Sequence, residues 1–448
     1  MKNHKRCFLI PFVFGLVLIF TLGGLAEQGN SGAKKIITLY QSGPSLVIEK
    51  DQIMLAKGLN DISRSLPETV VTETVFTTSP GASLKSSRIV PAVNSQDRLL
   101  ETLVGTNVSV VKAGSSETAL EGTLVGIFNG KPLLKTSDGE MRLIDNPEEY
   151  RFRGFSPERK NARLELKLDA GEEIRTELAV GYQLSKLNWS PQYVGFLDEE
   201  NETLDLRGVA NIENRTGWNF QGVQLRLLAG EPKRDEGERN YFAAVRSLNQ
   251  QEAPEPEQVF EYYRYKVGFP VDLTSAVETQ VKFFHSDSVS YRKYYLFEPY
   301  SSSAVRTMLE LKNTEEQGLG IPIASGTIRI YEGSDEKTFI GEDSLPNLPV
   351  ERETELELGD AFDVKGERKR IDHDRIGERI WKDRIEITIE NKKEKPIQLL
   401  IKERLPGDWE IIRSSHDYEK VNSRVIQYGE AVPAKGTIEV SYLVQYEL

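Results

Sequence analysis

The sequence predicts an almost wholly β protein, built mainly from antiparallel β-sandwich domains in tandem. Apolar and polar residues alternate with a period of two along many stretches, such as residues 204–214 and 438–446. This is the pattern of strands with one buried face. Gly, Pro, Asn and Asp separate these stretches at short intervals, as turns between strands require. Only residues 96–104 have a convincing helical pattern, with apolar residues on one face.

Residues 1–26 have the pattern of a secretory signal. A basic start precedes an apolar core from Phe8 to Leu22, and small residues end the stretch at Ala26. We expect cleavage near Ala26, after that residue, and export to the periplasm or the extracellular space. The alternative is an N-terminal membrane anchor that is not cleaved, because the apolar run approaches the ~20 residues that span a bilayer.

The chain is acidic and almost free of cysteine. Its 448 residues have a formal net charge of −12, and removing Lys2, Lys5 and Arg6 with the signal takes this to −15 (−12 minus 3). We therefore expect no nucleic-acid partner, because phosphate binding needs a basic surface. The single cysteine, Cys7, lies in the signal, so the mature chain forms no disulfide and performs no thiolate chemistry.

Two modules are expected before residue 160. Residues 33–95 contain short runs of β-branched and aromatic residues, which predict an N-terminal β module. Residues 96–157 begin with the short helix, capped by Asn94 or Ser95, and continue with five short strands, a number typical of a small SH3-like barrel. Asn-Gly and Asp-Gly pairs indicate hairpins between them. The strands are expected at Val108–Val111, Leu120–Ile127, Pro132–Leu134, Met141–Ile144 and Tyr150–Phe152.

The stretch from Leu187 to Pro232 carries the strongest local patterns, within a first β-sandwich part over residues 160–232. A strand at 204–214, with room for a bulge at Gly208, precedes a turn and a second strand at 223–228. We predict that these two strands form an antiparallel pair. The residues expected to anchor the fold are Trp189, Pro191, Tyr193, Asn214, Gly217 and Trp218.

Three segments complete the predicted organisation. Residues 233–258 have little apolar content and are expected to be a disordered loop or linker. A middle β-sandwich is expected over residues 259–372. A C-terminal immunoglobulin-like β-sandwich is expected over residues 373–448.

A weak internal repeat accompanies these domains. Three alternating strands each end in an asparagine, Asn214, Asn313 or Asn391, before a loop and another apolar strand. The separations, 313 − 214 = 99 and 391 − 313 = 78 residues, suit sandwiches of roughly 100 residues or somewhat fewer. Chance is the alternative explanation, because asparagine commonly ends strands.

Several motifs make the chain similar to a known family. They are Trp189-Ser190-Pro191, Asn214-Arg215-Thr216-Gly217-Trp218, Leu227-x-x-Gly230-Glu231-Pro232, Gly326-x-x-Arg329-Ile330-Tyr331, Ile340-Gly341-Glu342-Asp343, Leu358-Gly359-Asp360 and Leu405-Pro406-Gly407-Asp408-Trp409. From about Ala162 to Leu448 the chain resembles bacterial exported proteins that carry the domain of unknown function 4139. It departs at Trp218, where the family leads us to expect an acidic residue before the tryptophan. The resemblance implies no catalytic residues.

No pattern predicts an active site, a metal or a cofactor. Three histidines of the mature chain lie near aspartates: His285 with Asp287, His373 with Asp372 and Asp374, and His416 with Asp417. No pair of histidines has the His-x-His or His-x-x-x-His spacing of a zinc site, so we expect solvated loop histidines. No Gly-x-Ser-x-Gly elbow occurs, and 69 acidic residues make the choice of any one carboxylate pair uninformative.

Residues Asp198 to Thr203 are the one candidate for calcium. Their side chains offer many oxygens, but they lack the Asp-x-Asp-x-Asp-Gly spacing of a preformed calcium loop. We expect a solvated hairpin tip, with calcium binding as the alternative.

A cluster of tyrosines is the candidate recognition surface. Such a surface would stack on sugars or contact a protein, whereas the alternative is packing within the core and across strands. We favour packing, because alternation turns half of them inward. The candidates are Tyr262, Tyr263, Tyr265, Tyr291, Tyr294 and Tyr295.

Taken together, these features predict an exported, non-enzymatic protein of the cell envelope. We expect it to bind or scaffold a protein or glycan of the envelope through sandwich surfaces and loops. Contact with a membrane is expected only through the N-terminal segment, if that segment is not cleaved. The alternative function is a hydrolase of envelope polysaccharide or peptide, with a cleft between β domains.

Overall fold

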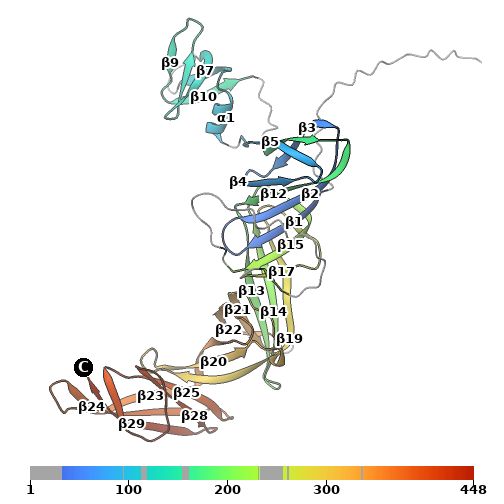
Figure 1. Ribbon diagram of the computed structural model, residues 1–448. Coiled ribbons are helices and arrows are strands. Elements are labelled where there is room, and N and C mark those ends of the chain that lie inside the picture. Colours follow the sequence, from blue (N-terminus) through green and yellow to red (C-terminus); the bar gives the residue numbers. More distant parts are fainter. Residues whose placement is uncertain are drawn as a thin grey trace, which may run out of the picture.

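The computed structural model describes residues 33–93, 95–112, 119–153, 161–230, 232, 256–259, 262–333 and 337–448 (Figure 1). They form a mostly β structure of four sheets, in which α1 (Gln96–Thr102) is the one α-helix of the described part. No helix in these ranges is long and apolar enough to cross a membrane. The predicted signal and residues 233–255 of the predicted linker lie outside the described residues.

The predicted helix and five strands of the small module are present. Ser95 caps α1, because its side chain accepts a hydrogen bond from the Arg98 N–H at 3.3 Å. Asn129 and Gly130 both have positive φ, 50° and 77°, as the tight hairpin turn predicted from Asn-Gly requires. The sheet contains, in order, β10 (Pro147–Phe152), β6 (Asn107–Lys112), β7 (Leu120–Phe128), β8 (Lys131–Lys135) and β9 (Met141–Leu143).

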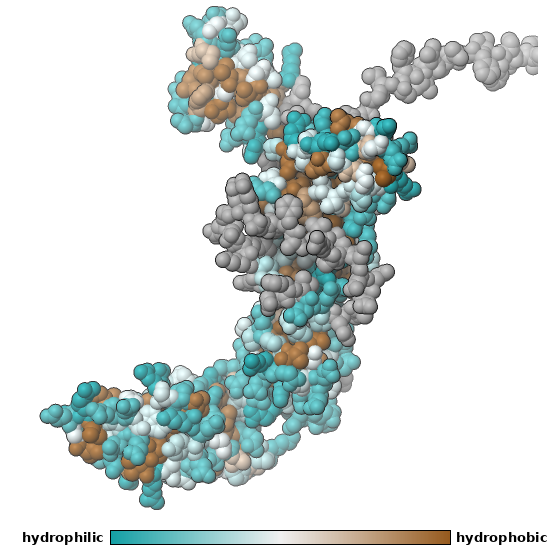
Figure 2. Space-filling view, in the orientation of Figure 1, coloured by the Kyte–Doolittle hydropathy of each residue, from teal (hydrophilic) through white to brown (hydrophobic). Residues whose placement is uncertain are grey.

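This small module buries only a modest apolar core, around Leu100, Leu124 and Leu134. Small modules leave a large share of their surface exposed. Phe128 and Met141, for example, stay 55% and 52% exposed. Figure 2 accordingly shows apolar side chains gathered on the surface of this module.

The N-terminal strands and the strands after residue 160 share one core. The eight-stranded sheet contains β16 (Glu257–Val259), β17 (Tyr262–Lys266), β15 (Phe220–Ala229), β1 (Lys34–Tyr40), β2 (Ser45–Leu55), β12 (Ile174–Leu184) and β4 (Val70–Thr78), with β18 (Val271–Leu273) beside β15. The three-stranded sheet contains β3 (Gly58–Leu66), β11 (Ala162–Ala170) and β5 (Ala82–Val90). Leu39, Leu166 and Trp189 belong to one hydrophobic cluster. The segments expected at 33–95 and 160–232 therefore fold together.

The fourth sheet has thirteen strands and runs through the rest of the described chain. Its main path contains β22 (Thr338–Leu345), β21 (Gly326–Glu332), β13 (Leu187–Asp198), β14 (Thr203–Asn214), β19 (Glu278–Phe297), β20 (Ala304–Lys312), β23 (Glu353–Arg375), β24 (Ile380–Asn391), β29 (Thr437–Glu447) and β26 (Asp408–Ser414). Off this path lie β25 (Ile397–Arg404), β28 (Val425–Val432) and β27 (Glu419–Asn422). In Figure 1 these strands follow one another along a curved body.

Two long strands link three successive modules, of which the first has the core around Trp189, the second the core around Leu309 and the third the core around Ile387. β19 has 20 residues and pairs with β14 up to Ser290 and with β20 from Tyr291. β23 has 23 residues and pairs with β20 along its first half and with β24 along its second half. The boundary expected between residues 372 and 373 thus falls inside a continuous strand.

The prediction that the strands at 204–214 and 223–228 form an antiparallel pair is wrong. β14 pairs with β13 and β19, whereas β15 pairs with β1 and β17 in a different sheet. The turn from Asn214 to Gly217 therefore carries the chain from one sheet to another. Alternation shows only that each strand has one buried face, and that pattern is the same for paired strands and for strands in facing sheets.

The sequence suggested antiparallel sheets, but the sheets also contain parallel pairs. β15 pairs in parallel with β1, β21 with β13, and β25 with β19. In each case the strand that follows Asn214, Asn313 or Asn391 pairs with a strand from an earlier part of the chain. The three parallel pairs are therefore equivalent positions of a repeat.

The asparagines themselves confirm that the weak internal repeat is real. Asn214 and Asn391 end β14 and β24, Asn313 directly follows β20, and all three are at most 2% exposed. Each side-chain amide donates to a backbone carbonyl further along the chain, on Leu273 at the end of β18 (3.0 Å), Leu348 (3.0 Å) and Val432 at the end of β28 (3.3 Å) respectively. Three residues after each carbonyl comes a residue with positive φ, namely Ala276, Glu351 and Lys435.

Asn391→Ala should lower the free energy of unfolding by about 1–3 kcal/mol, because buried backbone groups lose their partners. In addition to Val432, the Asn391 amide serves the carbonyls of Lys395 and Pro433, and its oxygen accepts from the Lys393 N–H. Denaturant midpoints measure the loss. The control is Asn201→Ala at an exposed hairpin tip, which should stay within about 0.5 kcal/mol of wild type. Equal effects of the two variants would contradict the structural role of the repeat.

Candidate functional site

The motif residues of the Leu187–Pro232 stretch lie mostly inside the protein. Trp189 is 1% exposed and its indole N–H donates to the Leu228 carbonyl at 3.3 Å. Pro191 is also buried, and Tyr193 is fully buried with its hydroxyl donating to the Ala324 carbonyl at 2.8 Å. Burial raises the pKa of Tyr193 well above its ordinary value, so this side chain stays a neutral donor.

The turn after β14 has a built structure of its own. Gly217 adopts a positive φ of 77°, which glycine reaches without strain. The Asn214 side chain donates to the Trp218 carbonyl at 2.8 Å, and the buried Thr216 hydroxyl donates to the Asn214 oxygen at 2.7 Å. Trp218 is half-buried and packs against the first core.

A bulge in β19 places an aromatic side chain that the sequence did not single out. Gly208 pairs with Phe284 and Val209 with Lys282, so Phe283 is an extra residue on β19. The bulge expected at Gly208 therefore lies on the partner strand. A Cβ on Gly208 would lie 3.1 Å from the Phe283 ring, which explains the need for glycine there.

Phe283 is the centre of an aromatic cluster between the first two modules. Its ring centroid lies 5.5 Å from that of Trp189, 6.0 Å from that of Tyr193 and 5.2 Å from that of Tyr265, each in an edge-on arrangement. Aromatic pairs of this geometry add about 0.5–1.5 kcal/mol beyond their burial. The bulge thus places the Phe283 side chain where it packs against these three aromatic rings.

A second irregularity in β19 brings three ligand-type side chains together on its outer side. Leu204 pairs with Val289 but Leu206 pairs with Ser286, so β19 carries another extra residue here. The His285 Nε2 lies 3.0 Å from an oxygen of Asp205 and 3.0 Å from an oxygen of Asp287. Bulges of this kind redirect side chains, often beside functional sites. The sequence pairs His285 with Asp287 but does not reveal Asp205.

Arg207 completes the outer cluster. Its guanidinium donates to the two carboxylate oxygens of Asp205, at 3.1 Å and 2.5 Å. Arg207 holds the pKa of Asp205 below its ordinary value, and His285 contributes in the same direction. Asp205 is therefore ionised at neutral pH.

A cleft of about 500 Å³ adjoins the same strand. Its walls come from the region around β17 and the loop after it, from β19, and from the loop after the short 3-10 helix η3 (Glu315–Gln317). Phe269, which is 53% exposed, and Lys282 are its most accessible aromatic and basic groups. The lining consists of Pro256, Tyr265, Lys266, Gly268, Phe269, Lys282, Phe283, Phe284, His285, Ser286, Gly318, Leu319 and Ile321.

The six tyrosines do not form the recognition surface considered from the sequence. Tyr262 and Tyr263 are half-buried, and the other four are at most 7% exposed: Tyr265, Tyr291, Tyr294 and Tyr295. Core packing, the interpretation that alternation favoured, accounts for these four. Of the six, Tyr265 alone contributes to the cleft, where its hydroxyl donates to the Pro322 carbonyl at 2.8 Å.

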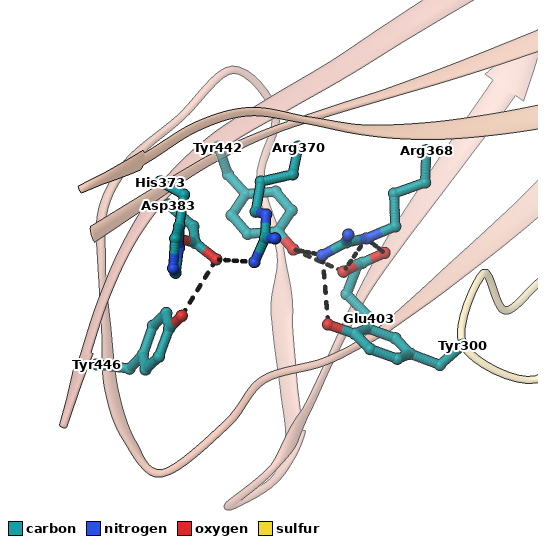
Figure 3. A network of polar contacts seen from close by, with 8 residues as sticks. All are labelled: Tyr300, Arg368, Arg370, His373, Asp383, Glu403, Tyr442 and Tyr446. Atoms are coloured by element: carbon teal, nitrogen blue, oxygen red, sulfur yellow. Dashed lines mark hydrogen bonds and ion pairs between the residues drawn. The ribbon is translucent and has the colours of Figure 1, made fainter. Parts of the chain in front are cut away.

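The third module contains a network of charged groups, drawn in Figure 3. Glu403 on β25 is 0% exposed and accepts hydrogen bonds from Arg368 on β23 at 3.0 and 3.1 Å. The Tyr442 hydroxyl on β29 donates to the same carboxylate at 2.6 Å. Burial raises the pKa of Glu403, while Arg368 and Tyr442 act in the opposite direction. These contacts tie the two layers of the module together.

A neighbouring part of the same network surrounds Asp383. His373 lies 2.5 Å from one of its oxygens, and the Tyr446 hydroxyl donates to the other at 3.3 Å. Arg370 forms an ion pair with Asp383 at 3.7 Å, and His373 stacks on Trp381 with ring centroids 4.6 Å apart. His373 thus contacts Asp383 on the adjacent strand. This contact and the stacking on Trp381 indicate a structural role for His373.

The remaining sequence candidates are surface features. His416 contacts the Ser415 hydroxyl at 2.8 Å. Asp198 accepts hydrogen bonds from the Glu200 and Asn201 N–H groups at the exposed tip between β13 and β14. Calcium binding at this tip stays an untested alternative.

Comparison with known proteins gives one match. A family model described as "Domain of unknown function (DUF4139)" matches residues 178–412, more than half of the chain. No curated protein matches the sequence. The matched residues include β19, the cleft beside it and the Asp205–His285–Asp287 cluster.

Trp189→Ala should cost about 3–5 kcal/mol of unfolding free energy, because a buried indole and its contacts with Phe283 are lost. Trp218→Ala should cost clearly less, because Trp218 is only half-buried. Denaturant midpoints of the two variants provide the comparison. A loss for Trp189→Ala within about 0.5 kcal/mol, as for a surface substitution, would contradict its role as an anchor.

Arg368→Met should destabilise the protein by about 3–5 kcal/mol near neutral pH, because Glu403 is left as a buried unpaired charge. The variant also loses a group that lowers the pKa of Glu403. A folded-state pKa above the unfolded value favours the protonated folded form, so stability is greatest at low pH and falls as pH rises through the folded pKa. The deficit relative to wild type should therefore shrink as pH is lowered towards the unfolded pKa of about 4.3.

Denaturant midpoints over a series of pH values test this prediction. The control is Arg292→Met, which removes the ion pair between Arg292 and Glu310. The Arg292 side chain of this pair is 57% exposed. Exposed pairs contribute about 0–1 kcal/mol, so this variant should show a small deficit at every pH. A deficit for Arg368→Met that is independent of pH would show that Glu403 is not the group left unpaired.

Proposed function

Because this chain belongs to the DUF4139 family, whose description names no activity, we propose its function from the structure. It is an exported, non-enzymatic protein of the cell envelope that binds another protein or glycan of the envelope. The partner binds at the cleft beside β19, and the linked β modules are the scaffold that holds this cleft.

The cleft is the observation that carries this proposal. Its volume of about 500 Å³ lies within the ~300–1,000 Å³ of typical ligand sites, which are mostly apolar with a few polar groups. Phe269 presents an exposed aromatic ring to a partner, and Lys282 has no ion-pair partner among the described residues. Aromatic residues such as Phe are enriched at binding interfaces.

The lining of the cleft favours binding over hydrolysis. A glycosidase needs a pair of carboxyl groups facing its substrate, and the lining of this cleft, as far as the structure describes it, includes no Asp or Glu. Ser286 is committed to a hydrogen bond with the Gly318 carbonyl at 2.6 Å. Among the described residues, the hydrolase alternative thus has no pair of acids in the lining of the cleft itself.

Finer assignments of fold belong to the same proposal. In the five-stranded module the last strand, β10, pairs with the first, β6, which supports an SH3-like barrel. In the repeated modules the strand after each asparagine pairs in parallel with a strand from an earlier part of the chain, and not with the strand that the asparagine follows or ends, which supports immunoglobulin-like sandwiches. Small modules of these kinds commonly present binding surfaces on a rigid frame.

Export is the proposed route to the envelope. Protein isolated from its native envelope should begin at Glu27, because the signal pattern ends at Ala26. Intact-mass measurement determines the new terminus. A mass that includes residues 1–26, in protein that stays with membranes after a carbonate wash, would establish the anchored form instead.

Phe269→Ser should weaken capture of the partner from envelope extracts, because the exposed ring at the cleft is lost. Purified tagged chain from Glu27 onwards is the bait, and quantitative mass spectrometry with glycan analysis measures what it retains. The matched control is Phe339→Ser, because Phe339 is 54% exposed on β22 and does not line the cleft. Equal capture by both variants and wild type would contradict binding at the cleft, and release of shortened glycan or peptide would favour the hydrolase.

A further inference from the structure

The outer cluster on β14 and β19 has the donors of a metal site. One ligand comes from β14 and two from the irregular segment of β19, and one ligand atom of each residue lies within 4.8 Å of the others. We propose that Asp205, His285 and Asp287 bind a divalent first-row transition metal ion. This site goes beyond the proposed function, because metal binding here does not require a partner in the cleft.

The spacing of the donors fits such an ion. Metal–nitrogen and metal–oxygen bonds of about 2.1 Å place neighbouring ligands of an octahedral ion about 3.0 Å apart, which is the bond length multiplied by the square root of two. The His285 nitrogen lies 3.0 Å from each of the two carboxylate oxygens. A tetrahedral ion with the same bonds would need about 3.4 Å. The spacing therefore matches octahedral coordination, as of Mn²⁺, more closely than the tetrahedral coordination usual for Zn²⁺.

The chemistry of the donors points to the same class of ion. Imidazole suits zinc, iron and nickel, whereas carboxylates suit manganese and magnesium, so a mixed set selects transition ions such as Mn²⁺ and Zn²⁺. A neutral imidazole has one proton to share between its two nitrogens. In the absence of an ion, one Nε2–H would have to serve both carboxylates, whereas an ion accepts all three donors at once.

Arg207 has the position of an orienting group. Its fork holds both oxygens of Asp205 at 3.1 and 2.5 Å, and groups that fix a ligand in this way commonly tune metal affinity. Its positive charge opposes that of the ion and limits the affinity. Asp287 is 88% exposed in its side chain, so the positions that the protein leaves open face solvent.

The site also adjoins the proposed binding cleft through a shared residue. His285 lines the cleft and belongs to the cluster. A bound ion would connect β14 to β19 across the irregular segment and stiffen one wall of the cleft. Metal binding is therefore expected to raise the thermal midpoint of the protein.

Isothermal titration of the chain from Glu27 onwards with MnCl₂ or ZnCl₂ alone tests the proposal. We expect saturable binding of one ion per chain. His285→Gln and Asp287→Asn should each weaken that binding at least about 10-fold, because even loss of an outer-shell partner costs 10–100-fold. Both residues are on the surface, so far-UV circular dichroism should stay unchanged.

The matched control is His416→Gln, which removes another histidine beside an aspartate and should leave binding at the wild-type level. Absence of saturable binding, or equal binding by wild type and the folded His285→Gln variant, would overturn the proposal. Partner capture by the Phe269→Ser variant depends on the cleft alone, so its outcome is independent of this result. An Asp287→Asn variant that loses metal binding but keeps partner capture would likewise separate the two sites, because Asp287 does not line the cleft.

Discussion

The structure depends on strands that belong to two modules at once. In β19 the ladder passes from β14 to β20 between Ser290 and Tyr291, with no unpaired residue between them. In β23 the ladders with β20 and β24 overlap at Lys365, which pairs with Ala304 on β20 and with Glu390 on β24. Because each backbone hydrogen bond fixes both of its strands, the modules are joined by ladders where tandem domains usually have linkers. A functional site on β19 is then held from both sides.

Shared strands place many polar groups inside the protein, and the repeat provides their partners. A buried backbone group without a hydrogen bond is costly. An asparagine offers both donors and an acceptor, so Asn214, Asn313 and Asn391 each donate to a carbonyl in the segment just after them and to a carbonyl further along the chain. In the third module, the Glu403 and Arg368 pair performs a similar task between layers. These hydrogen bonds explain why an asparagine recurs at the ends of these apolar strands.

Much of the fold could be predicted from local pattern, but contacts across strands could not. Alternation showed the strands around Leu206 and Leu225, because each has one buried face, yet it could not show that they lie in different sheets. His285 and Asp287 are two residues apart and visible as a pair, whereas Asp205 joins them only through the register of β14 on β19. Phe283 was missed for a related reason: a bulge changes the alternation, and single-sequence patterning cannot place an extra residue on one strand of a pair.

β19 is one continuous strand that couples the first two modules and supports the site. Hydrogen–deuterium exchange of the amides from Glu278 to Phe297 tests it directly. We expect slow exchange through the transition at Ser290 and Tyr291, with local fast exchange confined to the irregular positions near Phe283 and Asp287. Fast exchange across Ser290 and Tyr291, at the rate of an exposed linker, would show that the modules are separate and would contradict the account.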